Sequence, residues 1–202
     1  MSTQVTTGLQ VRKSVELTID GEKVVALEGS TLLDACRASG KEIPTLCFGD
    51  TITPKNACRV CMVELEGSRT LVPSCSRKVE AGMVVKTDTE RTSHSRKLVL
   101  ELLGSSVDLS LTKNVAKWND NYDAEPSRFG APSQHHGKRD DAITGHHHAP
   151  DGQTAETVHQ PVKIDNALYV RDYSKCILCY QCVDAWRAVA KHFCDHNRWS
   201  WL

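Results

Sequence analysis

Nine cysteines are the residues of this sequence best suited to chemistry, and their spacing favours metal ligation. The count is odd, C-x-x-C pairs recur, and the polar residues 1–13 do not resemble an export signal, so a disulfide scaffold is not expected. The first group of cysteines has the spacing Cys47-x10-Cys58-x2-Cys61-x13-Cys75. Four thiolates in such a set can hold a 2Fe–2S cluster, with two thiolates on each iron.

The pair Cys58-x-x-Cys61 is close enough for a loop to wrap around bridging sulfides. The small Ala57 permits the backbone amides to approach the cluster sulfurs, which with burial would set the potential. Four cysteines would also form a closed zinc site, but zinc ribbons usually show two C-x-x-C knuckles, whereas Cys47 and Cys75 are single and distant. Cys36 lies among apolar residues of a predicted helix and is interpreted as a small buried side chain.

The elements around the first group predict a small α+β domain over residues 14–90. Residues 15–19 and 23–27 alternate apolar and polar side chains, and Asp20-Gly21 between them predicts a tight hairpin turn. Thr31 precedes a predicted helix over 32–38, with Asp34 placed for a capping box and Gly40 ending the helix. Strand-like runs over 60–65, 71–73 and 83–87 complete the expected sheet.

Beyond this domain the pattern becomes helical and then loses its periodicity. Residues 88–103 predict a helix whose apolar stripe is Leu98, Val99, Leu102 and Leu103, within a docking segment over 91–111. Residues 112–161 are rich in Asn, Asp, Gly, Pro, Ser and His and are expected to form a long linker. Its five histidines could hold a metal, although a solvated loop is the simpler interpretation: His135, His136, His146, His147 and His148.

Composition excludes several classes of partner. The formal net charge is zero, so the electrostatic footprint of a nucleic-acid binder is missing and no nucleic acid is expected. No apolar run approaches the ~18 residues of a membrane span. A cytoplasmic location is the default expectation.

The first cysteine group also carries a family resemblance. The run Asn56-Ala57-Cys58-Arg59-Val60-Cys61-Met62-Val63-Glu64-Leu65, with Cys47 before it and Pro73-Ser74-Cys75 after it, resembles the N-terminal ferredoxin domain of one oxidoreductase family. The family includes the large iron–sulfur subunit of NADH dehydrogenase, the diaphorase small subunit of NAD-reducing hydrogenase and the alpha subunit of NAD-dependent formate dehydrogenase. The resemblance covers about residues 14–104.

The resemblance implies a β-grasp fold and a 2Fe–2S cluster ligated by Cys47, Cys58, Cys61 and Cys75. Many members next carry a 4Fe–4S site made by one histidine and three cysteines, but residues 103–108 contain no cysteine and His94 comes too early on the helix. This difference favours formate dehydrogenase alpha subunits, some of which lack that site, with the hydrogenase and NADH dehydrogenase subunits as alternatives.

The second cysteine group lies in an expected 4Fe–4S module over residues 162–185. Cys176, Cys179 and Cys182 occupy the first three positions of the bacterial ferredoxin run C-x2-C-x2-C-x3-C-P, and Trp186 stands at the fourth. No second run follows, so the module is incomplete. Its three thiols can bind a 4Fe–4S or 3Fe cluster, or none.

Residues 186–202 form an aberrant tail that suggests a change of reading frame. In formate dehydrogenase alpha subunits the corresponding stretch resembles Cys-Gly-Glu-Gln-Trp-Gln-Asn-Thr-Phe. Inserting two nucleotides into one synonymous coding of Trp186–Cys194 produces that stretch, so the chain is expected to be the N-terminal piece of a longer subunit. A natural short subunit is the alternative.

The expected function is outer-sphere electron transfer by an iron–sulfur protein, with no catalytic residues in this chain. The resemblance implies a molybdopterin-type catalytic domain that oxidises formate and a flavin/NAD-binding diaphorase subunit as partners. Whether the chain belongs to an enzyme in its own right stays open. A zinc-stabilised assembly module, with the helix over 88–103 as a partner-binding face, is the alternative of another class.

Overall fold

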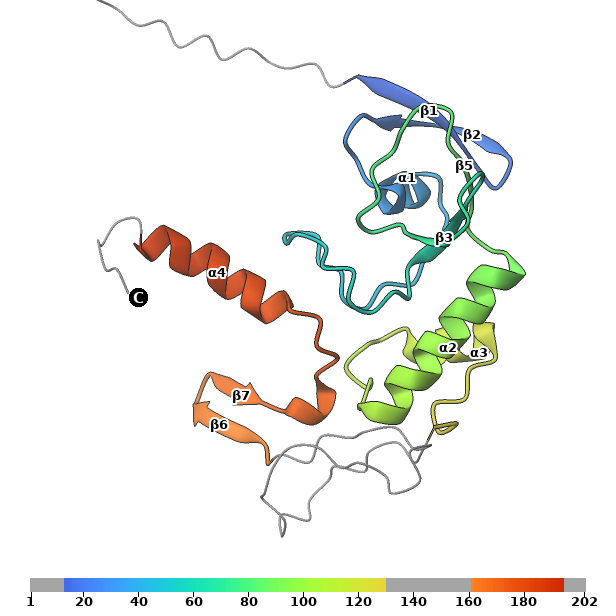
Figure 1. The fold of residues 1–202 in the computed structure, drawn as a ribbon. Coiled ribbons are helices and arrows are strands. Elements are labelled where there is room, and N and C mark those ends of the chain that lie inside the picture. Colours follow the sequence, from blue (N-terminus) through green and yellow to red (C-terminus); the bar gives the residue numbers. More distant parts are fainter. Residues whose placement is uncertain (1–12, 130–160, 195–202) are drawn as a thin grey trace, which may run out of the picture.

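The computed structural model describes residues 13–129 and 161–194. The first part of this range begins with a small α+β domain, as the sequence predicts. Its elements are β1 (Ser14–Ile19), β2 (Glu22–Leu27), α1 (Leu32–Ala38), β3 (Met62–Leu65), β4 (Val72–Pro73) and β5 (Val84–Lys86). The strands form one sheet in the order β2-β1-β5-β3-β4, in which only β1 and β5 pair in parallel, and α1 lies against it (Figure 1).

The expected hairpin is confirmed, with Ile19 paired to Glu22 across the turn. Asp20 and Gly21 both have positive φ angles, 49° and 85°, which suits the turn type whose twist matches two antiparallel strands. The Asp20 carboxylate also accepts hydrogen bonds from the backbone N–H and the hydroxyl of Thr87, each at 2.7 Å. The turn therefore holds the chain where it leaves β5.

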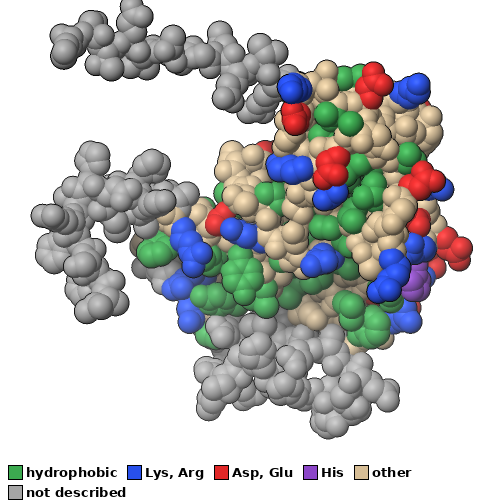
Figure 2. All heavy atoms as spheres, turned by 45° about the horizontal axis from the view of Figure 1, so that its top comes forward, with side chains coloured by type: hydrophobic (Ala, Val, Ile, Leu, Met, Phe, Trp, Pro, Cys, Tyr) green, Lys and Arg blue, Asp and Glu red, His purple; other side chains and the backbone are tan. Residues whose placement is uncertain are grey.

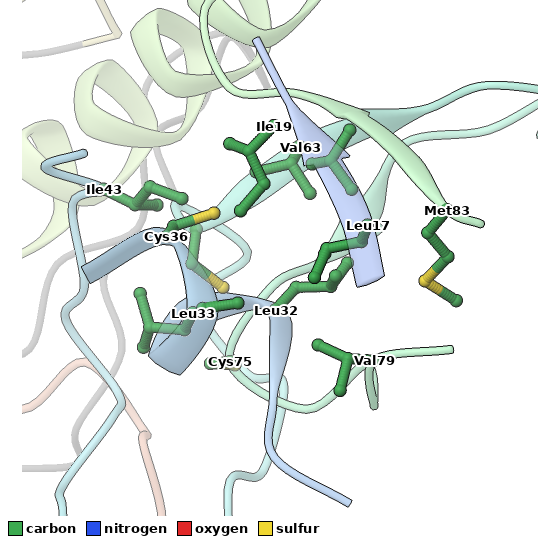
Figure 3. Close-up of a cluster of buried hydrophobic side chains, with 13 residues drawn as sticks. Leu17, Ile19, Leu32, Leu33, Cys36, Ile43, Val63, Cys75, Val79 and Met83 are labelled. Carbon is green, nitrogen blue, oxygen red and sulfur yellow. The ribbon is translucent and has the colours of Figure 1, made fainter. Parts of the chain in front are cut away.

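Helix α1 begins and ends where the sequence predicts. Thr31 and Asp34 form a reciprocal capping box, and Gly40 takes a φ of 76° just beyond the helix. The apolar face of α1 packs on the sheet to make the main core (Figure 3). Cys36 is fully buried in this core, as expected.

The chain between β3 and β5 differs from the sequence expectation at the strand ends. The strand expected over 60–65 begins only at Met62, because Val60 and Cys61 still belong to the turn that carries the cysteines. The last two strands are also shorter than the runs 71–73 and 83–87.

Helix α2 (Glu90–Ser106) follows the sheet and is longer than expected. Its predicted apolar stripe is right only in part: Val99 and Leu103 pack against an apolar cluster, but Leu102 is 50% exposed and Leu100, outside the stripe, is fully buried. The face of α2 that is buried is largely polar. Its side chains form hydrogen bonds with β3, with Thr87 after β5 and with the segment after α3. Its fully or nearly buried polar residues are Thr92, Arg96, Glu101 and Ser105. His94, which comes too early on the helix to match the family's histidine ligand, is exposed.

A further helix lies inside the range expected to be a linker. Helix α3 (Val115–Tyr122) packs Trp118 into a second apolar cluster with Leu100 of α2. The sequence did not predict this helix, because its composition is polar and Trp118 is its one buried side chain. Residues 130–160, which carry the five linker histidines, lie outside the described residues.

The C-terminal part is a small module that contacts the first domain. It contains the hairpin β6 (Lys163–Asn166) and β7 (Tyr169–Arg171), a turn of 3-10 helix over Tyr173–Lys175, and α4 (Gln181–Cys194). The Lys175 ammonium pairs with the Asp108 carboxylate beyond α2, and Lys55 pairs with Asp184 at 2.7 Å. The expected aberrant tail is helical as far as Cys194, and residues 195–202 lie outside the described range.

The surface mixes charges of both signs. Acidic and basic side chains are interspersed over the face drawn in Figure 2, which agrees with a formal net charge of zero. Among the described residues, no helix has the length and apolar character needed to cross a membrane.

Candidate metal centre

The four cysteines of the first group are brought together and buried. Three of them lie in the loop between α1 and β3, and the fourth follows β4. The exposed fractions are 3% for Cys47, 8% for Cys58, 2% for Cys61 and 1% for Cys75. All four are free thiols. A set of free, buried sulfur donors is the environment that an iron–sulfur cluster requires.

The loop backbone is shaped around Cys58. Asn56 and Arg59 both adopt left-handed φ angles, 56° and 61°, although neither is glycine. The Arg59 side chain secures the turn by donating a hydrogen bond from Nε to the carbonyl of Asn56 at 2.9 Å. Non-glycine residues in this region cost free energy and concentrate at binding sites.

Backbone amides point at the sulfurs, as the small Ala57 leads one to expect. The N–H of Cys58 donates to Cys47 Sγ at 3.4 Å, and the N–H of Ala57 contributes a further hydrogen bond to the same sulfur. Such amide donors stabilise negative charge on sulfur and so favour the thiolate form that binds metal.

The thiols are arranged as two pairs. Cys58 donates a hydrogen bond to Cys47 and lowers the pKa of Cys47 to about 6. Cys75 does the same for Cys61, whose pKa falls to about 7. The same contacts, together with burial, raise the pKa values of the two donors. In each pair, one thiol is therefore favoured over its partner to carry negative charge.

The two members of the second pair, Cys61 and Cys75, are tied together through Ser74, which is fully buried. Its backbone N–H and its hydroxyl both donate to the carbonyl of Cys61, at 3.1 Å and 2.8 Å. Because Ser74 is bonded directly to Cys75, these contacts fix the spacing of the second pair. Asn56 Oδ1 lies 3.5 Å from Cys75 Sγ and links this pair to the loop around Cys58.

This donor set fits a 2Fe–2S cluster. Two irons each need two thiolates, and the structure offers two thiol pairs with amide donors beside them. Within residues 13–129 and 161–194, no group of three or more His, Cys, Asp or Glu side chains is arranged to hold a single metal ion.

Cys36 differs from the other four cysteines in what acts on its thiol. Burial raises the pKa of the Cys36 thiol to about 11, and the charge of Asp20 raises it further. Unlike Cys58 and Cys75, whose pKa values are also raised, Cys36 has no second thiol acting on it. The interpretation of Cys36 as a packing residue agrees with this.

The second cysteine group occupies a similar but more open loop. Leu178 and Tyr180 flank Cys179 with left-handed φ angles of 54° and 62°. Cys176 and Cys179 are half-buried, and Cys182 is exposed at the start of α4. Trp186, which stands in the fourth ligand position, is 70% exposed.

The structure brings this second loop against the first, which the sequence did not predict. Cys179 packs against the apolar cluster that contains Cys47 and Cys58. Gln181 reaches to within 3.7 Å of the position that a Cβ on Gly49 would occupy. No local signal indicates such a contact, because the two loops are far apart in the sequence.

Comparison with known families agrees with the donor set. Residues 12–90 match a family described as a 2Fe-2S iron-sulfur cluster binding domain. This segment is a 2Fe–2S cluster binding domain. The match ends at the start of α2, so it contains the four cysteines of the first group and none of the second.

Several curated proteins resemble the chain, and some of them match it well beyond the 2Fe–2S domain. The NADP-reducing hydrogenase subunit HndD of Solidesulfovibrio fructosivorans is 36% identical over 171 residues, which cover 82% of this chain and 26% of that protein. The alpha subunit of the NADPH-Fe(3+) oxidoreductase of Geobacter sulfurreducens is 32% identical, with 84% and 18% coverage. An NADH-quinone oxidoreductase component of Rickettsia bellii is 40% identical, with 44% and 13% coverage.

A solved structure shares the fold. An NAD+-reducing NiFe hydrogenase in the H2-reduced state aligns with a TM-score of 0.60 over 89% of this chain and 68% of that chain, at 23% identity. At this identity the likeness concerns the fold alone. The chain spans about a quarter or less of the length of the curated relatives.

Proposed function

We propose that this chain is an electron-transfer segment of a multi-subunit oxidoreductase. The observation that carries the proposal is the set of four buried thiols, arranged as two pairs inside a 2Fe–2S cluster binding domain. A 2Fe–2S cluster supplies one-electron chemistry at a potential set by its protein surroundings. No bond of a substrate is made or broken at such a centre.

The residues of the chain would serve this role by ligation, charge stabilisation and exclusion of water. Cys47, Cys58, Cys61 and Cys75 would ligate the two irons as thiolates. The amides of Ala57 and Cys58 would stabilise negative charge on sulfur. Burial of all four sulfurs would keep water away from the cluster.

The parent complex is proposed to link a molybdopterin-type formate-oxidising site to a flavin and NAD. The formate assignment is supported by the absence of cysteine from residues 103–108 and by the resemblance of the shifted-frame tail. The proteins similar to this chain favour a hydrogenase or an NADH dehydrogenase as the parent complex instead, and two of them carry NADP or NADPH in their names. DNA sequence beyond codon 186 decides between these parents, because a molybdopterin-type domain in a shifted frame supports formate and a hydrogenase domain contradicts it.

The second cysteine group is proposed to hold a 4Fe–4S or 3Fe cluster. Two left-handed residues around Cys179 shape its loop as Asn56 and Arg59 shape the first. Three thiolates leave one ligand position of a 4Fe–4S cluster to another group. Iron analysis tests this: more than two irons per chain, falling to two in Cys179→Ser, supports a second cluster, and two irons in both proteins contradicts it.

Electron counting tests the proposed function directly. Purified, anaerobic protein is titrated with dithionite while its visible absorbance is followed, and is then mixed with a one-electron acceptor. The Cys179→Ser protein should take up one electron per chain and return it, whereas the additional change Cys75→Ser should remove this uptake. A Cys179→Ser protein that takes up no electron would contradict the proposal.

A further inference from the structure

Arg96 of α2 is a buried cation without an acidic partner among the described residues. Its side chain is 2% exposed. The guanidinium donates to the Thr87 carbonyl at 2.8 Å, the Met62 carbonyl at 3.0 Å and the Tyr122 hydroxyl at 3.0 Å. It also lies over the Tyr122 ring, 5.4 Å from the centroid, while its Nε has no hydrogen-bond partner. All its hydrogen-bond acceptors are neutral.

An unpaired buried charge is costly, so this arrangement calls for a physical reason. Burial removes the solvation of a charged group, and neutral acceptors replace it only in part. The other fully buried charged residue of α2 follows the usual rule, because Glu101 is paired with Arg128 at 2.7 Å. Arg96 therefore stands out within the same helix.

The position of Arg96 supplies the reason. Met62, whose carbonyl it holds, directly follows the cluster ligand Cys61 in the chain. The guanidinium therefore contacts the residue that follows a ligand in the chain. The carbonyl of that ligand, Cys61, accepts hydrogen bonds from Ser74. Burial raises the pKa of the Cys36 thiol and the charge of Arg96 offsets part of that rise, so the field of Arg96 reaches the sulfur of Cys36, which shares a buried cluster with Cys61 and Cys75.

We propose that the 2Fe–2S cluster is the counter-charge of Arg96 and that Arg96 raises the reduction potential of the cluster. A 2Fe–2S cluster with four thiolate ligands is negatively charged and becomes more negative when it takes up one electron. A fixed cation beside it stabilises the reduced form more than the oxidised form. Arg96 is a positioning residue here, since it acts through its field and through the carbonyl of Met62, the residue after the ligand Cys61. This inference rests on the proposed function.

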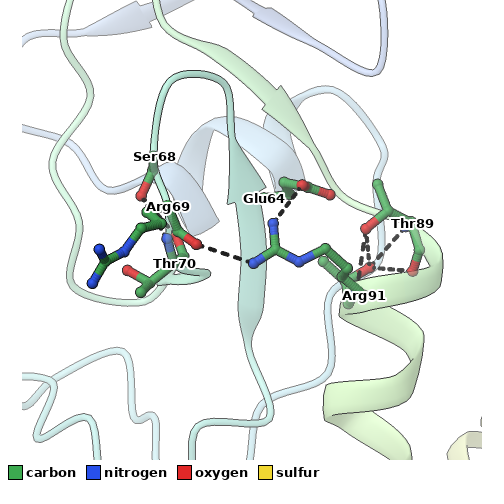
Figure 4. Close-up of polar contacts among 7 residues, drawn as sticks. Glu64, Ser68, Arg69, Thr70, Thr89 and Arg91 are labelled. Carbon is green, nitrogen blue, oxygen red and sulfur yellow. Dashed lines mark hydrogen bonds and ion pairs between the residues drawn. The ribbon is translucent and has the colours of Figure 1, made fainter.

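A purely structural role for Arg96 predicts a different result, and Arg91 offers the matched control. Arg91 lies on the same helix and also ties it to β3, through Glu64 at 2.9 Å and the Arg69 carbonyl at 3.2 Å (Figure 4). Its side chain is 53% exposed and is paired with an acid. Removing Arg91 takes away a cation and a tether without removing an unpaired buried charge.

The test is a redox titration of the loaded full chain, followed by electron paramagnetic resonance. Arg96→Gln should shift the potential of the 2Fe–2S signal to a more negative value, whereas Arg96→Lys and Arg91→Gln should leave it near that of the unmodified protein. An Arg96→Gln potential equal to that of the unmodified protein overturns the inference. So does an Arg91→Gln or Arg96→Lys shift as large as that of Arg96→Gln.

A second variant decides the matter where Arg96→Gln does not load a cluster. Tyr122→Glu places a carboxylate beside the guanidinium and neutralises its field, with Tyr122→Phe as the uncharged control. The expected result is a negative shift in Tyr122→Glu alone, and equal potentials in the two variants overturn the inference. An unmodified protein without a 2Fe–2S signal contradicts the proposed function instead, so the two failures are distinguishable.

Discussion

A cysteine serves as a cluster ligand only if its thiol can lose a proton and reach the iron. Cys47 and Cys61 meet the first condition, because hydrogen bonds from their paired thiols lower their pKa values to about 6 and about 7. Cys36 does not, since burial in the core raises its pKa to about 11. Cys58 and Cys75 also have raised pKa values, but each is hydrogen-bonded to a second thiol of the set, whereas no thiol acts on Cys36. This pairing, rather than the pKa alone, separates the four ligands from the packing cysteine.

Substitution of one ligand should abolish the cluster, whereas substitution of the packing cysteine should not. In Cys58→Ser one iron loses a thiolate, so the electron paramagnetic resonance signal of the 2Fe–2S centre and most of the bound iron should disappear. Cys36→Ser should keep both, with a lower melting temperature because a hydroxyl enters an apolar core. Loss of the signal in Cys36→Ser would contradict this division.

The buried carboxylate Glu101 makes a second prediction at the residue scale. Its only charged partner among the described residues is Arg128, so Arg128→Ala leaves a buried acid unpaired and should cost about 1–3 kcal/mol in the free energy of unfolding. Lys117→Ala breaks an exposed ion pair with Glu42 and should cost less than ~1 kcal/mol. Chemical denaturation of both variants checks the difference, and equal costs would refute the importance of burial here.

At the scale of elements, helix α2 connects the cluster loop to α3 and the segment after it. Leu100 packs in the apolar cluster that also contains Cys47, Cys58 and Trp118. Gly104 lies at the other close contact, where a Cβ would come within 2.8 Å of Pro126 Cβ and 3.2 Å of its Cα. The helix thus packs against the cysteine loop through Leu100. Its contact with Pro126 leaves no room for a residue larger than glycine at position 104.

Gly104→Ala should therefore destabilise the protein. Overpacking against Pro126 is expected to cost about 1–3 kcal/mol, whereas the gain in helix propensity is about 1 kcal/mol. We expect a net loss, because the Pro126 Cα belongs to the backbone and cannot rotate away. Leu102→Ala, at an exposed position of the same helix, is the control. Thermal unfolding that shows Gly104→Ala more stable than the unmodified protein would contradict the close packing.

At the scale of the whole molecule, two ion pairs hold the C-terminal module against the 2Fe–2S domain and the end of α2. Lys175 lowers the pKa of Asp108 to about 2, and the backbone N–H of Asp108 donates to the Ser174 carbonyl at 2.9 Å. Because the pKa of Asp108 is depressed, its stabilising effect is fully present above the ordinary carboxyl pKa near ~4. It is lost as the pH falls from there toward 2.

Removing this ion pair should loosen the module while the 2Fe–2S domain stays folded. Asp108→Asn should increase hydrogen exchange in peptides that cover residues 173–182, with little change in β1 and β2. Asp50→Asn, which breaks the exposed pair between Asp50 and Arg37, should leave both regions unchanged. Unchanged exchange over residues 173–182 in Asp108→Asn would mean that other contacts hold the module.

The sequence predicted those parts of the molecule that local signals determine. The Asp20-Gly21 turn, the Thr31 capping box and the spacing of the first cysteine group each depend on a few neighbouring residues. The buried face of α2, the anchoring of α3 by Trp118 and the contact of Cys179 with the first loop depend on segments that meet only in the folded chain. Arg96 escaped notice for the same reason, since its acceptors come from three separate segments.

The most direct test of the metal centre is electron paramagnetic resonance of the anaerobically purified, dithionite-reduced protein, combined with iron and zinc analysis. The cysteines of the second group are replaced by serine so that only the first centre contributes. We expect a rhombic spin-one-half signal and about two irons per chain. A silent sample that contains stoichiometric zinc would contradict the assignment and would identify the chain as a zinc-stabilised assembly module.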